Sequence, residues 1–254
     1  MRPFDPRRQP WISHHVPNPA ARLRLFCFPF AGGGASAYRG WARELPSDVE
    51  VCPVQYPGRE TRITEPLQTA LPVLVRMAAG ALEPLLDEPY AFFGHSMGAL
   101  MAFELTRELL HRGLRPPEQL VLSAYRAPTL PHWSALPYDL PHDEFVDRLR
   151  KLEGTPQAAL DSPELMEMIL PILRADCQVC DEYRLRDTTP LPVPLAVFGG
   201  RSDPEAGEAQ LQPWQALAGA GFTLRMFDGG HFYLNSARAG FMSALSEVLS
   251  ARHG

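Results

Sequence analysis

The stretch that decides the fold is YAFFGHSMGAL, residues 90–100. An aromatic and apolar run ends at Gly94, and an apolar helical pattern begins just after Ser96. The motif Gly94-x-Ser96-x-Gly98 between them predicts a strand, a sharp turn and a helix, with the serine hydroxyl at the apex of the turn and its backbone strained. The helix N-terminus behind the serine favours negative charge at that point. We therefore interpret Ser96 as a nucleophile; the alternative is a plain tight turn.

Strands and helices alternate on both sides of this stretch. Helical patterns lie at 67–86, directly after Ser96 and at 236–249. The strands are nearly all apolar, which is typical of a parallel sheet covered on both faces. We expect an α/β protein of the α/β-hydrolase type, with a mostly parallel sheet and helices on both faces. The expected strands are 22–28, 51–54, 90–94, 120–124, 195–198 and 222–227.

Composition divides the chain further. Residues 1–20 are rich in Arg and Pro and predict an irregular, solvated arm. Residues 126–192 carry many prolines, helical patterns at 143–152 and 164–186, and no convincing strand. We expect this part to be a helical lid inserted over the functional edge of the sheet, so that the hydrolase core consists of residues 21–125 and 193–254.

Size and charge narrow the class of protein. A chain of 254 residues is expected to form one domain, and a net charge of −5 without a Lys/Arg block argues against nucleic acid as a partner. We find no secretion signal and no membrane-spanning run, and four cysteines then fit a reducing cytoplasm. Cys177 and Cys180 form an isolated C-x-x-C, which we interpret as two cysteines one helical turn apart rather than as a metal site.

A nucleophilic serine needs a general base and a third group that orients the base. In α/β hydrolases the order is serine, acid, histidine, and Asp203 and His231 each follow a predicted strand, where open sheets place their ligands. We predict the triad Ser96–His231–Asp203. Alternatives are Asp203 as a turn or cap residue, His231 as a structural histidine, and Asp228 as the acid, although Asp228 resembles a turn residue. The side chain of His95 is expected to point away from that of the serine.

The oxyanion hole needs backbone N–H groups aimed at the developing charge. We expect one from Met97, after the nucleophile, and one from Ala31, in the loop where residues 32–34 are all glycine. The same loop also matches a dinucleotide pattern ending at Ala37. The next strand ends at Gln55 rather than at an acid that could hold a ribose, so we predict no cofactor.

Several blocks of the sequence resemble the stand-alone type II thioesterases of polyketide and nonribosomal peptide pathways. The resemblance covers nearly the whole chain after residue 20. One departure is LSAYRAP at 122–128, where a glycine and a second basic residue are expected near 124–125. The matching blocks are LFCFPFAGG (25–33), QYPGRE (55–60), FGHSMGA (93–99), FEL (103–105), LPILRAD (170–176) and GGHF (229–232).

The resemblance implies hydrolysis of acyl thioesters, with aberrant or stalled acyl groups removed from the phosphopantetheine arm of an acyl or peptidyl carrier protein. It also implies that the lid is mobile. Because such carriers are expected to be acidic, Arg59, Arg62 and Arg174 are candidates for docking.

Three other functions stay open. A carboxylesterase or lipase would use the same triad on oxygen esters. A binding protein of the same fold would leave Ser96 unreactive. A cyclising or transferring thioesterase usually ends a synthase, and we expect a complete separate chain because this sequence begins at Met1.

Overall fold

One six-stranded parallel sheet forms the centre of the molecule, in the order β2-β1-β3-β4-β5-β6. The computed structural model describes residues 10–152, 154–155 and 157–251. The predicted α/β fold is confirmed. The strands are β1 (Leu23–Phe28), β2 (Val49–Pro53), β3 (Tyr90–His95), β4 (Gln119–Ser123), β5 (Leu195–Gly200) and β6 (Phe222–Phe227).

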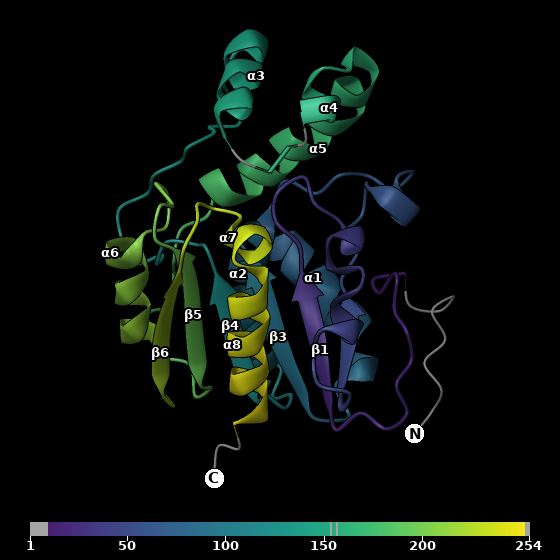
Figure 1. Cartoon of the computed structure of the whole chain (residues 1–254), viewed down its shortest axis with the longest axis vertical. Helices are drawn as coiled ribbons and strands as arrows, with labels where there is room; N and C mark the ends of the chain where they lie inside the picture. Colours follow the sequence, from purple (N-terminus) through teal and green to yellow (C-terminus); the bar gives the residue numbers. More distant parts are fainter. Residues whose placement is uncertain (1–9, 153, 156, 252–254) are drawn as a thin grey trace.

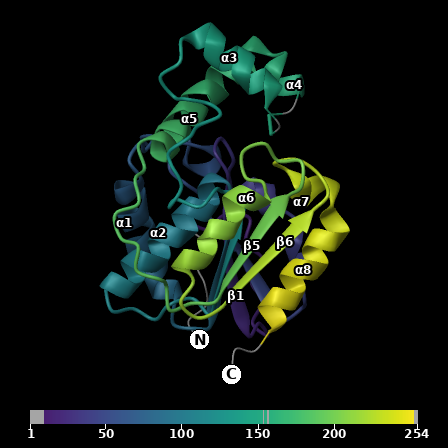
Figure 2. The ribbon, with the colours of Figure 1, turned by 90° about the vertical axis from the view of Figure 1, so that its left-hand side faces the viewer.

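Helices cover both faces of the sheet, as Figures 1 and 2 show. Helices α1 (Leu71–Leu82) and α2 (Met97–His111) pack on one face, and α8 (Arg238–Ser250) packs on the other. The remaining short helices of the core are α6 (Glu208–Leu211) and α7 (Tyr233–Ser236). None of the helices in the described ranges has the length and apolar character needed to cross a bilayer.

The two-sided cover explains why the strands are apolar throughout. Successive residues of a strand point to opposite faces. In β3, Phe92 therefore joins the core beneath α1 and α2, whereas Phe93 joins the core beneath α8, and both are fully buried. Burying a phenylalanine side chain contributes about 1.5–3 kcal/mol. A strand with both faces buried thus loses the polar alternation of a half-exposed strand.

The turn between β3 and α2 depends on a close approach of backbone to backbone. A Cβ atom at Gly98 would lie 1.9 Å from the carbonyl oxygen of Phe28 in β1. No side chain fits there without moving one of the two elements. The sequence motif therefore fixes the position of α2 on β1 as well as the shape of the turn.

A helical segment lies between β4 and β5 and stands above the carboxyl ends of the strands (Figure 1). It holds α3 (His142–Lys151), α4 (Gln157–Leu160) and α5 (Pro163–Asp181), with an apolar cluster of its own. We call residues 126–192 the α3–α5 segment. The predicted second helix was too long, because α5 ends at Asp181, where the Arg184 guanidinium donates to the carbonyls of Asp181 and Tyr183 at 2.6 Å each.

The prediction that the N-terminal arm is solvated was wrong for Trp11 and Ile12, whereas most of residues 13–20 are exposed or partly exposed. Trp11 and Ile12 are only 4% and 3% exposed and belong to the core beneath α1 and α2. The backbone also pairs with the chain beside β2: Gln55 N–H donates to the Trp11 carbonyl at 2.8 Å, and Ser13 N–H donates to that of Pro53 at 3.1 Å. Apolar burial and these hydrogen bonds hold the arm against the sheet.

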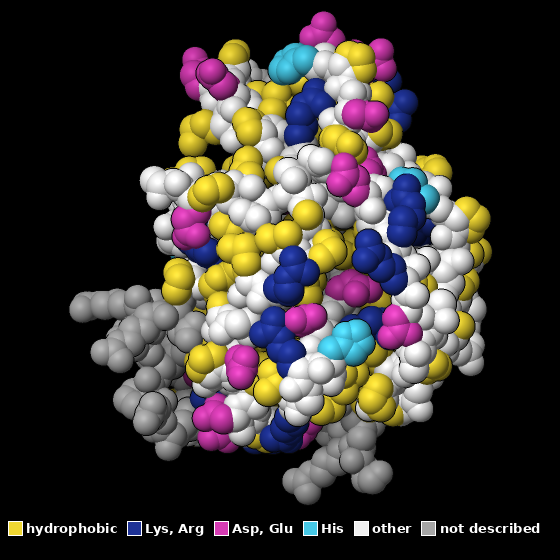
Figure 3. Space-filling model, turned by 180° about the vertical axis from the view of Figure 1, so that it is seen from behind, with side chains coloured by type: hydrophobic (Ala, Val, Ile, Leu, Met, Phe, Trp, Pro, Cys, Tyr) yellow, Lys and Arg dark blue, Asp and Glu magenta, His cyan; other side chains and the backbone are white. Residues whose placement is uncertain are grey.

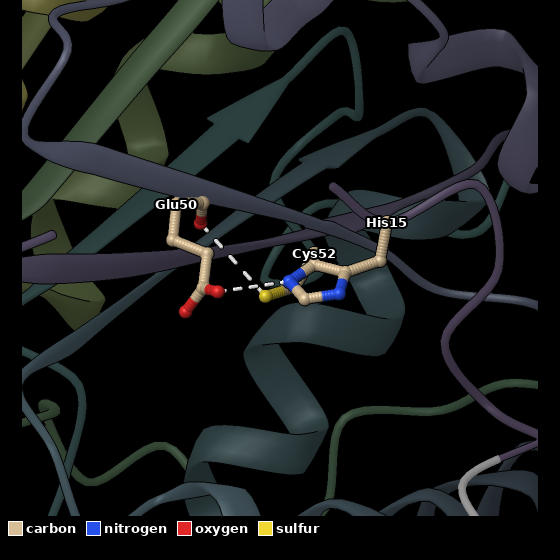
Figure 4. A group of neighbouring side chains, drawn as sticks. All are labelled: His15, Glu50 and Cys52. Carbon is tan, nitrogen blue, oxygen red and sulfur yellow. Dashed lines mark hydrogen bonds and ion pairs between the residues drawn. The ribbon is translucent and has the colours of Figure 1, made fainter. Parts of the chain in front are cut away.

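A buried ionic cluster also holds the arm, and Figure 4 shows the His15 ring facing the Glu50 carboxylate, with Cys52 beside them. His15, Glu50 and Cys52 offer ligand atoms within 4.8 Å of one another. The carboxylate is already engaged, since it pairs with His15 Nε2 at 2.9 Å and accepts from Asn18 N–H at 3.0 Å and Arg24 Nε at 3.1 Å. We interpret the cluster as an ion-pair network. Burial raises the pKa of Glu50, but the hydrogen bonds from His15, Asn18 and Arg24 together outweigh burial and lower the pKa to about 2.

Glu50→Gln is expected to destabilise the protein at neutral pH, because it removes the buried anion of Arg24, whose other carboxylate partner, Asp87, is 65% exposed. A carboxyl with a lowered folded-state pKa stabilises the fold above its unfolded pKa and loses that contribution as the pH falls through the folded pKa. The difference in unfolding free energy between the parent protein and Glu50→Gln should therefore be full at pH 7 and shrink between pH 4.5 and about 2. Urea unfolding at several pH values measures it. Glu118→Gln, which breaks an exposed pair with Arg115, is the control and should change stability little at any pH. A difference for Glu50→Gln that does not vary with pH would contradict the assignment.

Candidate active site

Ser96 lies between the end of β3 and the first residue of α2. Its φ is 54° and its ψ is −122°, so the predicted strained conformation is confirmed. The strain is held in place by the sheet, since Ser96 N–H donates to the carbonyl of Ser123 at the end of β4 at 2.8 Å. The turn thus presents the serine at the carboxyl edge of the sheet.

His231 and Asp203 come together at the same edge. His231 follows β6, Asp203 follows β5, and the distance between His231 Nδ1 and Asp203 Oδ2 is 2.8 Å. The side chain of Asp203 is fully buried, and its other oxygen accepts from the Glu205 N–H at 2.8 Å. Burial raises the pKa of Asp203, but the hydrogen bond and charge of His231 and the backbone N–H groups lower it overall. The carboxylate is therefore ionised at neutral pH and can orient the imidazole.

The rival acid is located elsewhere. Asp228 is almost wholly exposed, and its side chain forms an ion pair with Arg201 at 3.4 Å. It is a surface turn residue, as its sequence position indicated.

Ser96 and His231 line one cavity of about 410 Å³. The structure thus brings base and nucleophile to the same cavity.

Nothing in the sequence indicated that His95 contacts the predicted catalytic base. Its buried ring packs against that of His231, with the ring centroids 5.3 Å apart. Its Nδ1 is 2.8 Å from the Ser123 hydroxyl, which is 2.6 Å from the Tyr233 hydroxyl. Burial, followed by the charge of His231, lowers the pKa of His95 well below its usual value. His95 is thus a neutral ring that packs against the imidazole of His231.

The loop after β1 faces the same cavity, which Ala31 and Gly32 both line. Gly33 N–H donates to the Phe30 carbonyl at 2.9 Å, closing a turn in which Gly32 has a φ of +77°. A positive φ at the third turn position favours glycine. Met97 is the first residue of α2, where N–H groups have no partner within the helix. Both expected oxyanion donors therefore belong to elements that meet beside Ser96.

The dinucleotide interpretation of this loop fails in the structure. The glycines open only a four-residue 3₁₀ helix, Ala35–Tyr38, rather than the α-helix whose N-terminus would hold a pyrophosphate. The Glu60 carboxylate also faces the loop and accepts from the Ser36 N–H at 3.3 Å. An acid at this point disfavours a phosphate group.

Two of the three expected docking arginines are buried, since Arg59 and Arg62 are 3% and 6% exposed. The prediction that they dock a carrier was wrong for these two. Arg174 is partly exposed and donates to the carbonyls of Tyr138 and Leu140 at 2.6 and 2.9 Å, and its role in docking stays a prediction. On the face seen in Figure 3, basic and acidic side chains alternate rather than gather.

Sequence reasoning missed two acids near the cavity. Glu205 lines it two residues after Asp203, and burial raises the pKa of Glu205. Asp176 of α5 is 1% exposed and bonds to the loop after β1. Asp176 lies in the LPILRAD block, which was the one signal for it, whereas Glu205 had no signal of its own.

Comparison with known proteins decides the family. The thioesterase domain model matches residues 23–251. The chain belongs to the thioesterase family. This thioesterase is 40% identical over 228 residues to the gramicidin S biosynthesis protein GrsT of Aneurinibacillus migulanus, covering 90% of this chain and 89% of that protein. It is 36% identical over 254 residues to thioesterase PikA5 of Streptomyces venezuelae, covering 100% and 90% of the two chains.

A solved structure agrees with these relatives. The type II thioesterase BorB from the borrelidin biosynthetic cluster superposes with a TM-score of 0.84 and 35% identity, covering 94% of this chain and 97% of that one. The resemblance to type II thioesterases of peptide and polyketide pathways is confirmed, and this thioesterase is a hydrolase that acts on thioesters.

Proposed function

We propose that this thioesterase removes acyl groups from the phosphopantetheine arm of acyl or peptidyl carrier proteins, using Ser96, His231 and Asp203. The observation that carries the proposal is that Ser96 and the His231–Asp203 pair meet at one cavity. The relatives named for antibiotic biosynthesis support a carrier-bound substrate, and removal of aberrant or stalled groups is the role proposed for it.

In the first half-reaction, His231 accepts the proton of the Ser96 hydroxyl while the serine oxygen attacks the thioester carbonyl. Asp203 stabilises the imidazolium that forms. The N–H groups of Met97 and Ala31 stabilise the oxyanion, and the pantetheine sulfur departs as a thiol with the proton that His231 had taken. A thiol of pKa about 8.5 is a better leaving group than an alcohol, so protonation of the leaving group matters less than in an ester.

In the second half-reaction, water replaces the thiol. His231 takes a proton from the water, which attacks the acyl-serine carbonyl, and the same N–H groups hold the second oxyanion. The acid leaves and Ser96 recovers its proton from His231. The histidine thus acts as base and then as acid in each half.

The cavity provides the acyl site in this proposal. Its wall is largely apolar and comes mostly from the α3–α5 segment, which we propose to be a lid. Leu136, Ile169 and Leu173 contribute aliphatic surface, and Tyr125 lies where the sequence departs from the family pattern. Apolar lining with a few polar groups suits an acyl chain that ends at a reacting carbonyl.

We also propose that the protein works in the cytoplasm. All four cysteines are free, and two of them, Cys177 and Cys180, lie on α5 as predicted and line the cavity. Free thiols fit a reducing compartment.

The decisive comparison uses one acyl chain on two leaving groups. An octanoyl group on a carrier protein should be hydrolysed to free octanoic acid with a kcat/KM at least about 100-fold above that for an octanoyl oxygen ester. Mass spectrometry of the product separates free acid from a transfer or cyclised product. Equal rates on thioester and ester would instead indicate a general esterase.

A further inference from the structure

Helix α5 is hydrogen-bonded to the loop after β1, which carries the expected oxyanion donor, Ala31. Asp176 Oδ2 accepts from the Gly32 N–H at 2.7 Å. The helix also lies directly over this glycine, since a Cβ atom at Gly32 would lie 2.6 Å from Leu173 Cδ2. Segments 144 residues apart in sequence thus meet at one peptide group.

Arg59 completes the contact from the other side. Its guanidinium pairs with both oxygens of Asp176, Nη2 donating to Oδ1 at 2.7 Å, and its Nη1 also donates to the Gly33 carbonyl at 3.2 Å. Asp176 and Arg59 are 1% and 3% exposed. Two sequence blocks that contribute nothing to the triad, QYPGRE and LPILRAD, therefore meet in this contact.

The hydrogen bond to the Gly32 N–H also affects the residue before it, Ala31. Gly32 N–H belongs to the peptide group that follows Ala31. The Ala31 N–H belongs to the preceding peptide group, whose Phe30 carbonyl accepts from the Gly33 N–H at 2.9 Å. With both peptide groups held, the rotations of Ala31 between them are restricted, and so is the direction of the Ala31 N–H. A donor displaced by about 1 Å can cost on the order of 100-fold in rate.

We propose that Asp176 is a positioning residue for the oxyanion hole, so that the hole is complete only when α5 is seated on the loop after β1. This inference rests on the proposed function of Ala31 as a donor. A movement of the α3–α5 segment that carries Asp176 away would loosen the oxyanion hole together with the cavity wall. Turnover is then coupled to closure of the segment over the acyl chain.

An ion pair at this depth needs both partners. Removing only one leaves a buried charge uncompensated, whereas replacing both with apolar residues of similar size is often neutral for stability. The double variant Arg59→Met, Asp176→Leu keeps the packing of α5 and removes the acceptor of Gly32 N–H. The rescue variant, Arg59→Met with Asp176→Asn, also leaves no buried charge but keeps an oxygen that can accept from Gly32.

The probe is a medium-chain alkyl trifluoromethyl ketone. The Ser96 oxygen adds to its carbonyl carbon, the proton passes to His231, and the carbonyl oxygen becomes an oxyanion held by the hole. A pantetheine thioether of the same alkyl length measures ground-state binding. For the double variant we expect kcat on the acyl carrier to fall, and Ki of the ketone to rise, by about 10- to 100-fold. The thioether Kd should change less than about twofold, and the rescue variant should retain most of the activity.

The matched control is Arg107→Met, Asp187→Leu. It removes another ion pair, at 2.9 Å, between α2 and the chain after α5, at a site away from the loop after β1. We expect its ketone Ki and kcat to match those of the parent protein. Thermal unfolding checks each variant, and the reversed pair Arg59→Leu, Asp176→Met replaces the double variant if the latter does not fold.

Unchanged ketone Ki and kcat in a folded double variant would overturn the proposal, as would an equal loss of ketone and thioether affinity. Failure of the proposed function is a different result. In that case the parent protein would not hydrolyse the acyl carrier, while the ketone measurement would still report on Asp176.

Discussion

Replacement of Ser96 by alanine is expected to reduce hydrolysis of an acyl-carrier thioester by on the order of 10⁵- to 10⁶-fold in kcat. Without the hydroxyl no acyl-enzyme forms, and only the oxyanion donors and substrate positioning still act on water. Alanine has a smaller side chain and no hydroxyl to place, so the fold should persist. The measurement is steady-state release of the carrier thiol, accompanied by thermal unfolding of both proteins.

A fluorophosphonate probe gives an independent test of the same residue. The parent protein should be labelled once, on the peptide that contains Ser96, and Ser96→Ala should not be labelled. Retained turnover in Ser96→Ala would refute the nucleophile. A parent protein that the probe leaves unlabelled would favour a binding protein of the same fold.

Asp203→Asn is expected to lower kcat by about 10³- to 10⁴-fold. The carboxylate accepts from His231 Nδ1, which keeps Nε2 unprotonated and ready to take the serine proton. An asparagine amide can donate to Nδ1 instead, and then the imidazole carries its proton on the wrong nitrogen. The change in volume is small, so the loss should be in kcat rather than in folding. Steady-state kinetics with an acyl carrier measures it.

Asp228→Asn is the matched control for this variant. It makes the same chemical change at the other acid of the region, three residues before His231, but at a side chain that is 97% exposed. Its kcat should equal that of the parent protein. A loss in Asp228→Asn together with full activity in Asp203→Asn would reverse the assignment of the acid.

The sequence predicted the features that depend on residues close together in the chain. The turn at Ser96, the apolar strands and the positions of Asp203 and His231 all follow from short patterns, because strand ends in a parallel sheet meet at one edge. The end of α5 was misplaced because no glycine or proline directly follows Asp181; the Arg184 side chain instead donates to the Asp181 carbonyl, the last of the helix.

Contacts between distant segments were not predictable in this way. Arginine side chains usually lie at the protein surface. Only the fold brings Asp176 to Arg59 and buries both side chains. His95 was discounted because its neighbours in sequence say nothing about the ring of His231. The arm was assigned to solvent because a tryptophan within a polar, proline-rich stretch shows no periodicity.

The contact of Trp11 and Ile12 with the edge of the sheet affects how copies of the molecule can associate. Strand β2 ends the sheet, and an uncovered end strand offers unsatisfied N–H and C=O groups to any other chain. The antiparallel bridge between Ile12 and Val54 occupies part of that edge, and Trp11 lies over the apolar surface beside it. The described part of the arm, from residue 10 to residue 20, thus covers part of this edge and disfavours aggregation through the sheet, and a shortened protein beginning at residue 21 would lose that protection.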